Sequence, residues 1–154
     1  MEIKKNMVFE YVNTFYIKYF IPKKATNKVW YGVNLDEDFN ILEMVAWSET
    51  ALNNDTNKFK LAEKTLDTIY IGSIIKYGDT FQKVLGRIGN IVFLSDGCDY
   101  ENIDEIGNDI SFHKTIEGLK EKRWEITGIE EEIEELTLEK VCEELGRTIK
   151  IIKE

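Results

Sequence analysis

The chain has few of the residues on which catalytic and metal sites are usually built. His113 is the single histidine, and the two cysteines, Cys98 and Cys142, lie far apart without ligand-type neighbours. A structural zinc site needs about four closely spaced Cys or His ligands, and catalysis through His113 would need a partner that local spacing does not supply. The sequence therefore predicts a protein that is not an enzyme, has no metal or cofactor, and keeps both thiols free.

Long apolar runs are also missing. No stretch approaches the roughly 20 apolar residues of a membrane span, and the first apolar segment is interrupted by Glu10, Asn13 and Lys18. Residues 1–6 are charged and do not resemble a secretion signal. We therefore expect a cytoplasmic protein that does not bind a membrane.

Basic residues are scarce where acidic residues are dense. Residues 96–145 hold 17 acidic and 5 basic residues, a net charge of −12, while the remaining residues carry +3. Such a segment repels phosphate, so we do not expect the protein to bind nucleic acid directly. A partner protein with a basic surface would be complementary to it, although the acidity could also serve solubility alone.

The single proline, Pro22, marks the expected end of a first strand over 8–21, because proline cannot donate a ladder hydrogen bond. Both faces of this strand are apolar, unless a bend near residues 13–14 divides it. Strands over 29–35 and 41–48 flank a polar turn and are expected to form a hairpin. This N-terminal part predicts antiparallel sheet.

Residues 68–95 contain three short apolar runs separated by glycine turns, which predict a meander or a small SH3-like barrel. Apolar residues at helical spacing predict short helices over 58–66, 111–123 and 138–145. We therefore predict a single α+β domain over residues 1–154, with a largely antiparallel sheet and two or three short helices.

The densest charge in the chain is a run of five glutamates in six residues. It produces a concentrated negative field that could occupy a basic groove on a partner protein or mimic a phosphate backbone, and a solvated linker is the alternative. A second acidic segment over 96–105 could add to this surface or bind a divalent cation. The predicted partner-binding residues are Glu130, Glu131, Glu132, Glu134, Glu135, Asp104 and Glu105.

Two alternatives come from other parts of the chain. A small anionic ligand, such as a signalling nucleotide, could meet basic and aromatic residues of the middle strands, namely Lys76, Tyr77, Phe81, Lys83 and Arg87. The aromatic-rich N-terminal strands could instead leave one sheet face exposed for a homo-oligomer.

Residues 136–153 carry the pattern L-T-x-x-x-[IV]-x-x-x-L-G, read here as LTLEKVCEELG, followed by IKIIK. This tail resembles one found in small accessory proteins of bacteriophages and prophages. The resemblance implies a protein that binds a host protein, including components of antiviral defence. Together with the charge pattern, it leads to the hypothesis of an anti-CRISPR-like inhibitor that binds a host nucleic-acid-handling or defence protein inside the bacterial cell.

Overall fold

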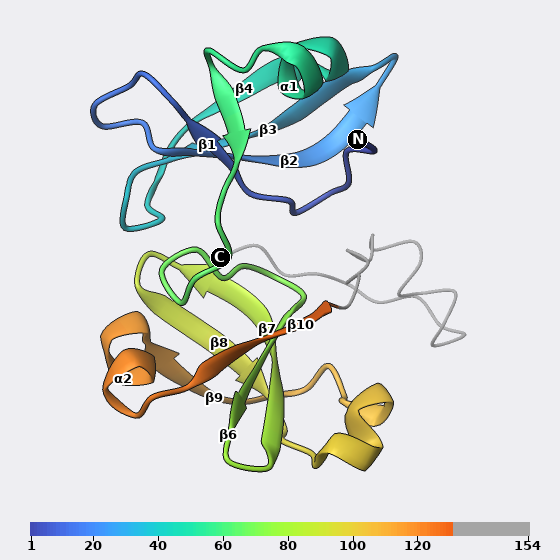
Figure 1. Cartoon of the computed structure of the whole chain (residues 1–154), viewed down its shortest axis with the longest axis vertical. Coiled ribbons are helices and arrows are strands. Elements are labelled where there is room, and N and C mark those ends of the chain that lie inside the picture. The colour runs from blue at the N-terminus through green and yellow to red at the C-terminus, as the bar shows by residue number, and fades with distance from the viewer. Residues whose placement is uncertain (131–154) are drawn as a thin grey trace, which may run out of the picture.

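A computed structural model describes residues 1–130, which form two lobes (Figure 1). Each lobe is built on a five-stranded antiparallel sheet. Within these residues, helix is limited to three segments of six residues each. The protein is therefore mostly β, and the predicted α+β class is wrong.

The first lobe, at the top of Figure 1, has the strand order β4-β3-β2-β1-β5. Four strands follow one another as a meander, and β5 returns to pair with β1. Its elements are β1 (Phe9–Tyr11), β2 (Tyr19–Thr26), β3 (Val29–Leu35), β4 (Ile41–Ser48), α1 (Glu49–Asn54) and β5 (Phe59–Leu61).

The second lobe repeats this arrangement, with the order β10-β6-β7-β8-β9. A four-strand meander is again followed by a short helix and by a fifth strand that pairs with the first. The two lobes therefore share one strand order. The elements are β6 (Ser73–Tyr77), β7 (Thr80–Ile88), β8 (Ile91–Ser95), η1 (Tyr100–Glu105), β9 (Ile110–Thr115), α2 (Ile116–Glu121) and β10 (Glu125–Glu130).

The strand predicted over residues 8–21 is in fact two strands, β1 and β2. This agrees with the alternative prediction, in which a bend near residues 13–14 divides the strand. Residues 12–18 turn the chain between β1 and β2, and the Thr14 hydroxyl donates to the Ile17 carbonyl inside this turn. Pro22 does not end a strand but lies within β2, next to a register shift between Pro22 and Lys24. A bulge of this kind is where a strand tolerates the missing N–H of proline.

The helix predicted over 58–66 is wrong, because β5 lies there. The ring of Phe59 lies 5.0 Å from the ring of Tyr11 and 6.4 Å from that of Phe9. Pairing with β1 buries Phe59 in the first core, and this outweighs the helical spacing. A helix forms just before it instead: α1 begins after Ser48, whose hydroxyl accepts from the Ala51 amide at 3.0 Å.

The helix predicted over 111–123 is correct only in its second half. Residues up to Thr115 form β9, which pairs with β8. The Thr115 hydroxyl then accepts from the Gly118 amide at 3.0 Å and caps α2. The helix predicted over 138–145 lies outside the described residues.

Each lobe has its own apolar core, and an aromatic contact is one of the links between the two lobes. Phe39, in the turn between β3 and β4, lies 6.2 Å from Tyr70 at the start of the second lobe. Both belong to a cluster that also buries Tyr19 and Ile21. Side chains from both lobes therefore share one buried cluster at the junction.

Candidate interaction surfaces

Within residues 1–130, one segment between β8 and β9 gathers exposed acidic residues; this segment, residues 96–109, is here called the acidic loop. It carries six carboxylates and no basic residue, and all six side chains belong to exposed residues. Within residues 1–130, none of them forms an ion pair. The six are Asp96, Asp99, Glu101, Asp104, Glu105 and Asp109.

The acidic loop is held in place by apolar anchors beneath it. Ile106 is buried in a cluster with Ile74 and Phe81, against which Ile103 and Cys98 pack. The backbones of Phe81 and Cys98 exchange two hydrogen bonds of 2.7 and 3.0 Å. A charged loop fixed in this way loses little conformational entropy when it binds a partner.

Two hydrogen-bonding side chains complete this support. The Asp99 carboxylate accepts from the Asn102 amide at 3.1 Å and from its side-chain nitrogen at 2.8 Å, which caps η1. Lys83 is 3% exposed, and its ammonium donates to the Ile106 carbonyl at 3.3 Å and to Asn108 Oδ1 at 2.9 Å. Lys83, predicted to meet a ligand phosphate, therefore anchors the acidic loop from below.

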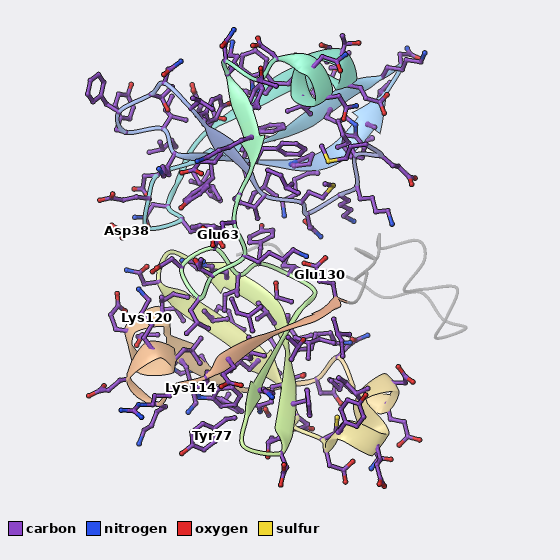
Figure 2. All side chains as sticks on the ribbon, viewed as in Figure 1. Asp38, Glu63, Tyr77, Lys114, Lys120 and Glu130 are labelled. Atoms are coloured by element: carbon purple, nitrogen blue, oxygen red, sulfur yellow. The ribbon has the colours of Figure 1, made fainter. Side chains whose placement is uncertain are left out.

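The other residues predicted to bind a small anionic ligand are dispersed. Lys76 pairs with Glu125 at 3.4 Å, and the ring of Tyr77 lies 5.4 Å from that of Trp124. Figure 2 shows Tyr77 at the end of the second lobe farthest from the first lobe. Lys76, Tyr77, Phe81, Lys83 and Arg87 line neither the cavity between the lobes nor the cavity of the first lobe, which are described below.

Arg87 lies at the opposite end, in the junction of the lobes. Its guanidinium carbon is 3.6 Å from the centre of the Phe39 ring. Its nitrogens donate to the carbonyls of Gly89 at 2.8 Å, Asp67 at 2.7 Å and Ile69 at 2.9 Å. Burial lowers the pKa of Arg87 to about 10. Arg87, which was predicted to bind an anion, therefore donates hydrogen bonds to backbone carbonyls and stacks on the Phe39 ring.

A cavity of about 450 Å³ lies between the lobes, and Glu130 is at its edge. Glu130 forms an ion pair of 2.5 Å with Lys64, which follows β5 in the chain. Figure 2 shows Glu130 at the end of β10, on the side of the second lobe nearer the first lobe, whereas η1, gold in Figure 1, lies toward the far end of the second lobe. Glu130 is thus separate from Asp104 and Glu105, with which it was grouped.

The remaining predicted partner-binding residues, Glu131, Glu132, Glu134 and Glu135, lie outside the described residues, as does the tail of residues 136–153. Asp104 and Glu105 belong instead to the acidic loop, together with its four other carboxylates. The signal that could have found this group was a run of fourteen residues with six acids and no base.

A second cavity, of about 360 Å³, lies in the first lobe and holds a buried polar network. The Tyr11 hydroxyl donates to Asn34 Oδ1 at 2.5 Å and accepts from Trp47 Nε1 at 2.8 Å. Asn34 in turn donates to Glu43 Oε1 at 3.0 Å. Burial raises the pKa of Tyr11 to about 12, so this phenol stays neutral near pH 7. Lys58 places its ammonium 3.8 Å from the Trp47 ring centre.

Residues 1–130 contain neither a group of metal-ligating side chains nor a helix that could span a membrane. Residues 1–130 bring no three His, Cys, Asp or Glu side chains together in a way that could hold a metal ion. None of the helices in that range is long and apolar enough to cross a membrane. Comparisons of the chain with protein-family models, with curated proteins and with solved structures find no match.

Proposed function

We propose that this protein is a non-enzymatic binding protein whose acidic loop engages a basic surface on another protein. The observation that carries the proposal is a set of six exposed carboxylates, without ion pairs in residues 1–130, on a loop with its own apolar and hydrogen-bonded anchors. Charged groups that are fixed before binding give electrostatic complementarity at low entropic cost.

The proposed partner is a bacterial host protein that handles nucleic acid, such as a defence effector, in the cytoplasm. Surfaces that bind a phosphate backbone are rich in Lys and Arg, and an array of carboxylates can occupy them in place of phosphates. A chain with a net charge of −9 is itself a poor ligand for nucleic acid. The resemblance of residues 136–153 to phage accessory proteins supports a host target.

The experiment is affinity capture from bacterial lysate with the full chain and with a loop-neutralised variant. The variant replaces five loop carboxylates with their amides and keeps Asp99, because that residue caps η1. A control variant neutralises five exposed carboxylates elsewhere and so matches the change in net charge. The loop variant changes Asp96, Glu101, Asp104, Glu105 and Asp109; the control changes Glu2, Glu37, Glu63, Asp79 and Glu121.

The expected result is one captured protein that is lost with the loop variant and retained with the control. The captured protein should be released by high salt, which screens exposed charges over about 10 Å or less. It should also be displaced by added duplex DNA, because DNA competes for the same basic surface. Equal capture by all three proteins, or no effect of DNA, would contradict the proposal.

A further inference from the structure

Among the strands of residues 1–130, β4 has a neighbour on one side only and is an open edge of the first sheet, with little of the usual protection against pairing. It stands at the end of the order β4-β3-β2-β1-β5. Of its eight residues only Glu43 is charged, and Ile41 and Met44 are 70% and 81% exposed. Natural edge strands are commonly short, or protected by lysine, proline or bulges. β4 has no lysine or proline, and its one register shift against β3 lies near its start, between the pairs Asn34–Glu43 and Leu35–Ile41. From Glu43 to Ser48 the strand is regular and mostly apolar, which suits an edge that is covered by another strand.

The backbone register shows which groups of β4 point outward. The amide of Glu49 donates to the Lys28 carbonyl at 2.8 Å, and Val45 and Trp47 oppose Gly32 and Trp30 in the same register. In an antiparallel ladder, hydrogen-bonded residues alternate with residues whose polar groups face the other side. From Glu43 onward, the odd-numbered residues of β4 therefore bond to β3, and the backbones of Met44, Ala46 and Ser48 face outward.

The two faces of this edge differ. Met44 and Ala46 share one face with Tyr31, which is 49% exposed, and this face is apolar. Glu43 and Trp47 share the other face, where both line the cavity of about 360 Å³. Lys58 lies on the Trp47 ring, 3.8 Å from its centre, and forms no ion pair within the described residues.

We propose that β4 pairs antiparallel with β4 of a second copy of this chain, with Val45 opposite Val45. This two-fold register places Met44 opposite Ala46 of the second copy, so outward-facing backbone groups meet in a hydrogen-bonded pair. Glu43 then lies opposite Trp47 of the second copy, within reach of its Lys58. Two symmetric Glu43–Lys58 contacts follow, and the glutamates do not face each other.

The neighbouring register is less complementary. With Met44 opposite Met44, Glu43 faces Val45 of the second copy and has no cation beside it. Charge complementarity therefore selects the register centred on Val45. An interface made by one strand pair falls in the small class, below about 1,200 Å², so association is expected to be weak and dependent on concentration.

The first test is the mass in solution, by light scattering and sedimentation, from about 1 μM to about 1 mM, a range that spans weak association. We expect a monomer–dimer equilibrium. Met44→Lys places two lysines near the two-fold axis and should shift the dissociation constant upward at least tenfold. Glu43→Lys and Lys58→Glu should each weaken the dimer, and the double variant should restore it. A chain that stays monomeric throughout overturns the proposal.

The second test reads the register by disulfide formation, in a background with Cys98→Ser and Cys142→Ser. A non-hydrogen-bonded pair brings its Cβ atoms to about 4.5–5.5 Å, near disulfide distance, whereas diagonal neighbours lie at about 7–8 Å. Val45→Cys should therefore cross-link under mild oxidation, and Met44→Cys, the matched control, should not. Efficient linking of Met44→Cys in place of Val45→Cys would overturn the register. The acidic loop lies on the other lobe, so failure here leaves the proposed function separately testable.

Discussion

Replacing Arg87 with alanine should destabilise the protein at the junction of its two lobes. The guanidinium donates to three backbone carbonyls at 2.7–2.9 Å and stacks on Phe39 at 3.6 Å. A hydrogen bond from a charged donor contributes about 1.5–3 kcal/mol, but such terms do not add, and burying the guanidinium offsets part of them. We expect the free energy of unfolding to fall by about 3 kcal/mol, close to the loss on breaking a buried charged contact.

Arg87→Lys is the matched variant, because it keeps the charge and loses the planar fork. One ammonium cannot reach three carbonyls that are arranged around a guanidinium, so a loss of about 1–2 kcal/mol is expected. The interaction with the ring is measured separately by a double-mutant cycle with Phe39→Leu. A desolvated cation–π contact predicts a coupling free energy of about 1–2 kcal/mol.

The assay is equilibrium unfolding in urea with tryptophan fluorescence. Trp30 and Trp47 report on the first lobe and Trp124 on the second, so single-tryptophan variants follow each lobe separately. Because Arg87 joins the lobes, Arg87→Ala should separate the urea concentrations at which the first and the second lobe unfold. A loss below about 1 kcal/mol for Arg87→Ala would place it within the range of surface changes and refute this reasoning.

Two further predictions concern titrating groups of the first lobe. Tyr11→Phe leaves two buried hydrogen-bonding groups unsatisfied and should cost about 1–3 kcal/mol in urea unfolding at pH 7. Because the folded pKa of Tyr11 is raised to about 12, its contribution is present below pH 10 and lost as the pH rises through 12, and the variant should lack this alkaline decline. Burial raises the pKa of the Glu10 carboxyl, but its hydrogen bonds with Lys18 and Lys60 outweigh this and hold the pKa below the ordinary value. The contribution of Glu10 to stability is therefore present at neutral pH and lost as the pH falls through the folded pKa. Glu10→Gln should lower the free energy of unfolding by about 0.5–1 kcal/mol at pH 7 and by almost nothing in acid. An equal loss at both pH values would contradict this.

Local turn chemistry made several strands predictable. The β3–β4 hairpin follows from the polar turn at residues 36–40, where the Asp36 carboxylate accepts from the amides of Asp38 and Asn40 at 2.9 Å. The strands over 73–77, 80–88 and 91–95 follow from glycine turns, of which Gly78 and Gly89 adopt positive φ values of 59° and 56°. These elements depend on neighbouring residues, so their sequence signals are strong.

The elements that were mispredicted depend on distant partners. β5 is a strand because β1 is beside it, about fifty residues earlier in the chain, and helical spacing at Phe59 does not report that neighbour. β9 is a strand because β8 lies alongside it. Short segments have weak intrinsic preferences, so tertiary pairing decides between helix and strand.

The same division applies to the candidate site. The sequence by itself determined the excess of negative charge, its location beyond residue 95, and the scarcity of catalytic residue types. Only the tertiary structure decided which carboxylates share a surface, that Lys83 supports them from within, and that Arg87 joins the lobes. Charge is a property of composition, whereas the direction of a long side chain depends on which carbonyls and rings the fold brings within its reach.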